Sequence, residues 1–432
     1  MVTKYKIIKH TKILLTLLVF HFILITFIKF QLWQDMWLRF LNNQFVNLWK
    51  DIYLIFIYLL ILIYCFKTKS YKKINENRKL YITFIILLII SFVVSVLNWN
   101  WIKTLIIWFK YDIWILFPLF FYSCISFTKK EKEEFYKKLI NLIKITIILS
   151  IIFAVIRFLS PKILFLLWYW PLWDWSANKA SPMYFDTWIY WIQRLSWIFS
   201  WPNHMAFYFV AFWPIILLSV FYKKLNYIWL ILYLMLLFWT LSRSWIIAFF
   251  WEIALLWLIL RKYYKNLRKY ILYLFFLFLF VLTALIWYLF ITWKYNQVIL
   301  RWASTSWHIK RSLNTVSKIK SRPIIWHWLW TAWPSAHYVK NDIIPESWFL
   351  QIFYELWFLW WFVRFLLIFI VISMLFKKTN FSYAYQSKED IFKISLLIGI
   401  IWLLIQGIVL HSFEDAMISL PLFIFIWILL SN

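Results

Sequence analysis

Long apolar stretches separated by short polar and basic segments run along the whole chain. Stretches of about 17 to 25 apolar residues suit one helix across a bilayer. We expect about twelve such helices, over residues 13–30, 51–66, 80–97, 105–127, 139–158, 203–222, 227–241, 245–260, 270–290, 349–375, 394–411 and 417–430. The pattern predicts an all-α, polytopic integral membrane protein in which residues 1–432 form a single membrane domain.

The positions of the basic residues predict the orientation of these helices. Basic residues in short loops stay on the cytoplasmic side of a membrane. The chain starts with Lys4, Lys6, Lys9 and Lys12, which place the N-terminus inside, and residues 1–30 are interpreted as a retained first helix. If successive helices cross the membrane in alternating directions from there, the later basic clusters also lie on the cytoplasmic side, at 67–73, 129–138, 223–224, 261–265 and 377–378. The net charge of +29 is therefore mainly a topology signal, and no nucleic-acid partner is expected.

The composition changes the picture in two ways. A chain that is 65% hydrophobic and 15% charged is not a water-soluble globule. It also has only 2 glycines and 35 tryptophans, together 37, where average usage would supply about 30 glycines and few tryptophans. This balance indicates that the gene comes from a lineage that translates the codon UGA as glycine. Most tryptophans in the sequence would then stand at UGA codons that encode glycine. The competing interpretation is an unusually aromatic membrane protein.

The distribution of the tryptophans favours glycine. Four of them crowd the short segment 326–333, just before Pro334, where turn chemistry requires a residue without a Cβ atom. Trp251 and Trp257 lie in the middle of a predicted helix instead of at a membrane boundary. The two cysteines, Cys65 and Cys124, fall near cytoplasmic helix ends, so neither a disulfide nor a cysteine metal site is expected.

Two of the predicted outward loops are long, 160–201 and 291–348. The second carries a basic excess on the face where the orientation rule does not require one. Its charged residues are Lys294, Arg301, Lys310, Arg311, Lys318, Lys320, Arg322 and Lys340, against Asp342 and Glu346. Such an excess favours an anionic partner such as a diphosphate, which a guanidinium can bind through two parallel hydrogen bonds. Weak attraction to anionic membrane lipid headgroups is the alternative.

Two further arginines lie at outward helix ends. Arg194 precedes the turn at 201–203, and Arg243 stands between Ser242 and Ser244. For Arg243, a side chain that reaches up to the headgroups would explain the position equally well.

With glycine in place of tryptophan, two segments form recognisable motifs. Residues 323–331 read P-I-I-G-H-G-L-G-T, and residues 346–361 read E-S-G-F-L-Q-I-F-Y-E-L-G-F-L-G-G. These resemble signatures of the O-antigen ligase and O-antigen polymerase superfamily. The stretches 194–203 and 240–244 are similar to its upstream motifs, so the resemblance covers about residues 190–375, in the right order.

The resemblance implies a GT-C-like architecture with its core at 190–375, including the outward loop 291–348. It implies a glycosyltransferase of the bacterial cytoplasmic (inner) membrane that acts in lipopolysaccharide biosynthesis. The enzyme would move a glycan from an undecaprenyl diphosphate carrier to a lipid or glycan acceptor with inversion, without a metal or another cofactor. A polymerase that joins repeat units is the alternative within the family, and a lipid-linked oligosaccharide flippase or other transporter is the alternative outside it.

The same resemblance indicates which residues act. A departing diphosphate needs fixed positive charge, which Arg194, Arg301 and Arg311 could supply. The remaining residues expected to bind the diphosphate or the glycan are Arg243, His327 and Asn203.

The base that activates the acceptor hydroxyl has several candidates. In the family a histidine commonly opens the motif that here begins with Glu346. A carboxylate can take over that role if it is held close and partly desolvated, but Glu346 could instead cap the helix that follows. Alternatively His308, His327 or His337 acts, unless these are hydrogen-bonded loop residues. Glu355, nine positions into the same helix, would lie at membrane depth, where an acid calls for a function or a partner.

Overall fold

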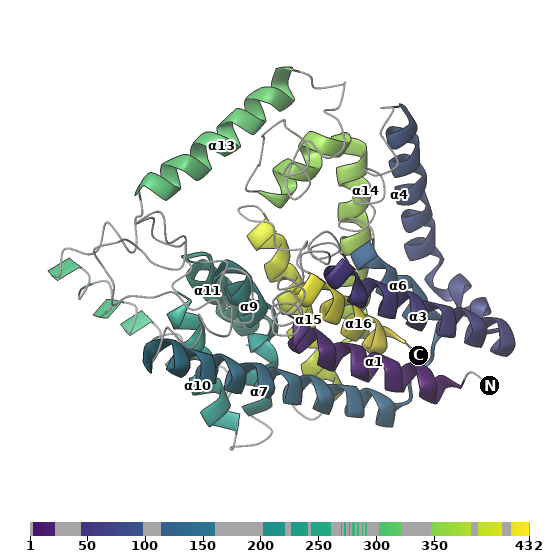
Figure 1. The fold of residues 1–432 in the computed structure, drawn as a ribbon, viewed down its shortest axis with the longest axis horizontal. Coiled ribbons are helices and arrows are strands. Elements are labelled where there is room, and N and C mark those ends of the chain that lie inside the picture. The colour runs from purple at the N-terminus through teal and green to yellow at the C-terminus, as the bar shows by residue number, and fades with distance from the viewer. Residues whose placement is uncertain are drawn as a thin grey trace, which may run out of the picture. The chain divides into compact units, whose positions relative to one another are not determined.

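The fold of the chain is helical throughout the part that the structure describes (Figure 1). The computed structural model describes residues 3–21, 45–97, 114–159, 202–220, 226–240, 243–260, 302–321, 347–381, 388–407 and 416–431, with isolated positions between 269 and 291. No strand occurs among these residues. The prediction of an all-α fold is confirmed for them, whereas the count of twelve membrane helices stays a prediction.

Most predicted apolar ranges overlap observed helices, but α1 begins nine residues before the predicted 13–30, and α13 lies within the predicted outward loop 291–348. The bounds of the longer helices are α1 (Lys4–Val19), α3 (Phe45–Thr68), α4 (Arg78–Leu97), α7 (Lys129–Leu159), α9 (Pro202–Val220), α10 (Asn226–Trp239), α11 (Arg243–Leu260), α13 (Trp302–Ser321), α14 (Trp348–Lys378), α15 (Lys388–Gly407) and α16 (Ala416–Leu430). By length and apolar composition, two segments of the described residues could cross a membrane, Leu48–Thr68 and Glu389–Gly407. Four shorter apolar helices lie in α9, α10, α11 and α16.

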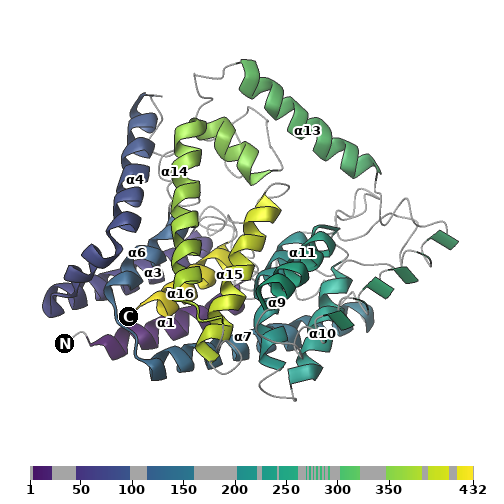
Figure 2. The same ribbon diagram turned by 180° about the vertical axis from the view of Figure 1, so that it is seen from behind.

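The chain divides into two compact units, each built from two stretches of sequence. The first comprises Met1–Ser70 and Phe127–Ile247, and the second comprises Tyr71–Ser126 and Ala248–Asn432. The prediction that 1–432 form one membrane domain is not tested by this division. In the first unit α1 packs on α3 and α7, and α10 packs on α7 and α9. In the second unit α14 contacts α4, α13, α15 and α16. The side-by-side arrangement of α4 and α14 is visible in Figure 2.

Two ion pairs join α1 to α7 and give their relative direction. Lys4 Nζ lies 2.5 Å from Glu131 Oε2, and Lys12 Nζ lies 2.7 Å from Glu134 Oε2. Because residue numbers rise together along both helices, α1 and α7 run parallel and begin at the same end. The prediction that both begin on the cytoplasmic side requires this arrangement.

The start of α7 is fixed by a capping box. The Thr128 backbone N–H donates to Glu131 Oε2 at 2.7 Å, and the Glu131 backbone N–H donates to Thr128 Oγ1 at 3.3 Å. Two N–H groups that have no partner within the helix are thereby satisfied. Glu131 therefore both starts α7 and ties it to α1.

The prediction of one continuous helix over 105–127 is wrong in the part that the structure describes. Residues 114–124 form three short helical pieces, η3 (Trp114–Leu116), α6 (Phe117–Phe121) and η4 (Tyr122–Cys124), before the non-helical link 125–128. The hydroxyls of Tyr81 and Ser123 both donate to the carbonyl of Phe120. Side-chain hydroxyls that take a backbone carbonyl compete with the helical ladder, and an apolar run does not reveal this competition.

A proline lies inside α9, near a contact with the neighbouring helix. Pro214 has no N–H, so the carbonyl of Val210, four residues earlier, has no helical donor. The hydroxyl of Tyr233 in α10 donates to the carbonyl of the adjacent Phe209. This hydrogen bond joins α10 to α9 in the turn that precedes the proline.

Candidate functional site

Most residues expected at the site lie outside the described residues or have described backbones only. Outside lie Arg194, Arg301, His327, His337 and Glu346. Asn203 is in the first turn of α9, Arg243 is the first residue of α11, and His308 lies on α13, but nothing is described of their side chains. The same holds for Glu355 on α14. Arg311 is the predicted site residue whose side chain is described.

Arg311 lies beside the packed face of α13. Thr315 is fully buried and donates from Oγ1 to the Arg311 carbonyl at 2.9 Å. Half-buried residues flank it at 311, 312, 316 and 319, a spacing that places them on one side of a helix. The half-buried Arg311 therefore lies on the more covered side of α13, one turn before Thr315. A half-buried guanidinium keeps part of its surface accessible to an anion.

The start of α14 is capped by Ser347, which the sequence reasoning missed. Ser347 Oγ accepts a hydrogen bond from the Leu350 backbone N–H at 3.3 Å and donates to the Gly407 carbonyl of α15, also at 3.3 Å. Serine at this position, followed by an apolar helix, is a recognised start signal. Ser347 is thus the hydrogen-bonding cap of α14, and the charge effect expected of Glu346 stays a prediction, because Glu346 lies outside the described residues.

Two charged side chains are buried where the sequence reasoning proposed no site. Glu252 of α11 and Arg364 of α14 are almost completely inaccessible. Glu252 shares its face with the buried Phe249, Ile253 and Leu256, and neither of its oxygens has a hydrogen-bond partner among the described residues. The sequence contains a signal for both residues, because each is a charged residue within a predicted membrane helix, where a charge is costly.

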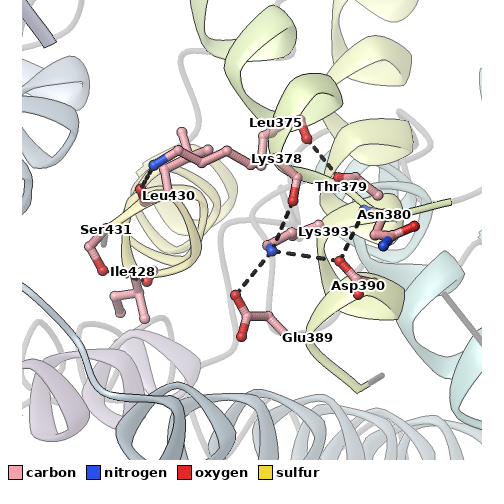
Figure 3. A network of polar contacts seen from close by, with 10 residues as sticks. All are labelled: Leu375, Lys378, Thr379, Asn380, Glu389, Asp390, Lys393, Ile428, Leu430 and Ser431. Atoms are coloured by element: carbon pink, nitrogen blue, oxygen red, sulfur yellow. Dashed lines mark hydrogen bonds and ion pairs between the residues drawn. The ribbon is translucent and has the colours of Figure 1, made fainter. Parts of the chain in front are cut away.

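A cluster of polar contacts joins the ends of α14, α15 and α16 (Figure 3). Lys393 Nζ lies 3.0 Å from Glu389 Oε1 and 3.6 Å from Asp390 Oδ1, and it donates to the Lys378 carbonyl at 3.1 Å. Lys378 Nζ in turn donates to the Leu430 carbonyl at 2.5 Å. Both lysines thereby satisfy carbonyls at helix C-termini, where positive charge is favourable. The cluster therefore holds helix ends together and is not a candidate site.

The acidic residues that start α7 are electrostatically matched. Partial burial raises the pKa of Glu131, but the hydrogen bonds from Lys4 and Thr128 and the charge of Lys4 outweigh it, so that this pKa lies below its usual value. The hydrogen bond and charge of Lys12 also lower the pKa of Glu134. Both carboxyls are ionised at neutral pH and are occupied by their lysines.

Metal ligation has no support in the described part of the chain. No group of three or more histidine, cysteine, aspartate or glutamate residues there could hold a metal ion.

Comparison with known proteins gives no relative for this chain. No protein-family model matches it, and no curated protein or solved structure is similar to it. The O-antigen ligase resemblance therefore rests on the motif segments themselves.

Proposed function

We propose that the chain is a membrane glycosyltransferase of the O-antigen ligase type. It moves a glycan from an undecaprenyl diphosphate carrier to an acceptor at the outer face of the bacterial inner membrane. The observation that carries this proposal is the position of three motif segments at helix starts. Asn203 lies in the first turn of α9, Arg243 opens α11, and Ser347 caps α14. All three helices begin outside under the predicted topology, and a helix start favours anions.

The membrane location is supported by the exposure of α3. Only 33% of the apolar segment Leu48–Thr68 is buried, whereas the core helix of a soluble protein would be mostly covered. Large apolar side chains are exposed along this segment, among them Ile52, Leu59 and Phe66, which is 73% exposed. A continuous apolar band of this kind is costly in water and favourable in lipid.

The glycine interpretation is supported by two buried indoles. Trp402 in α15 and Trp427 in α16 are each 1% exposed, and their Nε1–H groups have no acceptor among the described residues. A buried tryptophan usually finds a partner for this group, and leaving it unsatisfied costs about 1–3 kcal/mol. Glycine removes that cost and lets helices approach closely, which helix pairs in membranes exploit.

The proposed reaction needs three groups. The acceptor hydroxyl attacks the anomeric carbon from the face opposite the diphosphate, and its proton passes to a base, Glu346 or one of the histidines. The bond between the anomeric carbon and the diphosphate oxygen breaks, and the electron pair leaves with undecaprenyl diphosphate. Arg194, Arg301 and Arg311 neutralise the charge that develops there. Ser347 supplies the hydrogen-bonding cap of α14, which leaves the carboxylate of Glu346 for the role of base in this proposal.

A reconstituted assay tests the proposal. The chain with glycine at the tryptophan positions encoded by UGA is placed in nanodiscs with an undecaprenyl diphosphate-linked glycan and a lipid acceptor. We expect glycosylated acceptor and free undecaprenyl diphosphate, and loss of both in Arg194→Ala. Products that lengthen on the carrier itself would identify a polymerase, and absence of any transfer with a folded protein would refute the proposal. UGG codons behind Trp326, Trp328, Trp330 and Trp357 would remove the glycine interpretation and the motifs.

A further inference from the structure

The exposed face of α13 combines large apolar side chains with lysines. Ile309 is 54% exposed and Leu313, one turn later, is 63% exposed. Lys310 and Lys320 are exposed beside them, and the helix contains no acidic residue. Exposed leucine and isoleucine are costly in water, and lysines without an acid on their own helix repel one another. This face therefore suits a surface that is both apolar and anionic.

The opposite face of α13 fixes how the helix is turned. Thr315 is fully buried, and with 3.6 residues per turn Leu313 points away from the side of α13 on which Thr315 lies. The helix is not itself a span, because its basic residues exclude it from a bilayer core and it is not among the apolar segments able to cross. An amphipathic helix with these properties is typical of the membrane interface.

We propose that α13 lies along the surface of an anionic bilayer, with Ile309 and Leu313 between the headgroups and acyl chains and Lys310 and Lys320 on lipid phosphates. Anionic phospholipid is the occupant because it offers negative charge and apolar depth within one surface. A second copy of α13 would bring only further positive charge. The inference rests on the proposed membrane location but not on glycan transfer. It places Arg311, on the same helix, at the depth where a lipid-linked diphosphate is presented.

The test uses the full chain in liposomes with Cys65→Ser and Cys124→Ser, carrying a fluorescent label at Leu313→Cys. The matched control carries the label at Asn314→Cys, which is also exposed but lies about 100° further round the helix. Liposomes contain phosphatidylcholine alone or with phosphatidylglycerol, and nitroxide-labelled lipid or aqueous iodide is the quencher. We expect lipid quenching at 313 and iodide quenching at 314. Equal iodide quenching at both positions would overturn the proposal.

A change from neutral to anionic lipid and the removal of the lysines test the anionic preference. Lipid quenching at 313 should increase with phosphatidylglycerol, and each of Lys310→Gln and Lys320→Gln should weaken α13 docking by about fivefold in those liposomes alone. Quenching that is independent of lipid charge and of both lysines would contradict phosphate contact. Energy transfer between labels on different copies at low protein density would contradict the lipid as occupant. If the labelled chain shows the expected quenching at 313 but no glycan transfer is detected, the result would count against the proposed function and leave α13 docking intact.

Discussion

The basic residues of α1 and those of α13 differ in their neighbours. On α1, Lys4 and Lys12 each meet a carboxylate of α7 within 2.7 Å. On α13, Lys310 and Lys320 are exposed in a helix without a single acid, and the half-buried Arg311 lies beside them. A lysine that another helix neutralises stabilises the fold. The exposed lysines of α13 have no acid on their own helix, so we propose that they meet a ligand from outside the chain, and this contrast can be tested directly.

The largest effect is expected at Arg311. In the glycine-containing chain, Arg311→Ala should lower the rate of glycan transfer by about 10²–10³-fold, because one donor to the developing diphosphate charge is lost. Arg311→Lys should recover only part of it, since lysine lacks the planar pair of donors. The measurement is product formed per minute in nanodiscs, with Lys12→Ala as the basic-residue control that should leave the rate unchanged. An unaltered rate in Arg311→Ala would exclude it from the site.

Stability should respond most strongly at Lys393. Lys393→Met leaves Asp390 buried without its cation and should cost about 3 kcal/mol of unfolding free energy, without a specific effect on transfer. Thermal unfolding of the purified protein measures this. Lys377→Met, an exposed position on the neighbouring helix end, is the control and should change the melting temperature little. Equal melting temperatures for the two variants would show that the cluster contributes nothing.

A smaller loss is expected at the start of α7. Glu131→Ala removes both the capping box and the ion pair and should cost about 1 kcal/mol, whereas Glu131→Gln keeps an acceptor for the Thr128 N–H and should cost less. The order of melting temperatures, wild type above Gln above Ala, is the measurement. The reverse order would mean that the negative charge of Glu131 is unfavourable in the fold.

The smallest effect is a dependence on pH. The pKa values of Glu131 and Glu134 are lowered in the folded protein, so their contribution to stability is fully present above the ordinary carboxyl pKa of about 4.3 and is lost as the pH falls through the lowered values. Wild type should therefore exceed the double variant Glu131→Gln, Glu134→Gln in melting temperature at pH 7, and the difference should shrink towards pH 3. A constant difference across that range would contradict the ion-pair explanation.

Much of the helical fold was predictable because a long apolar run indicates where a helix lies. The cap of α7 also follows a known pattern, Thr128 followed three residues later by Glu131. The contact of Lys4 with Glu131 was not predictable, because it joins residues 127 apart in sequence and depends on how helices pack. The break within 114–124 was missed because hydropathy does not register that Tyr81, far away in sequence, takes the Phe120 carbonyl.

The residues of the candidate site stay a prediction from motif order and charge excess. Of them, the structure adds that Arg311 is half-buried on α13. Ser347 was not predicted, because the charge of Glu346 beside it suggested an electrostatic cap. Glu252 and Arg364 were missed because each is a single charge within a long apolar run, which a count of spans passes over.

The two buried indoles at 402 and 427 have a practical consequence for the laboratory. A chain made with tryptophan at these positions carries fluorophores in an apolar interior, so its emission should lie at short wavelength and shift to the red when α15 and α16 separate. Protein isolated from its own cells, with glycine there, would lack this optical signal and would absorb far less ultraviolet light per molecule. Concentrations derived from absorbance would then differ greatly between the two preparations, which offers a spectroscopic check of the genetic code before any sequencing.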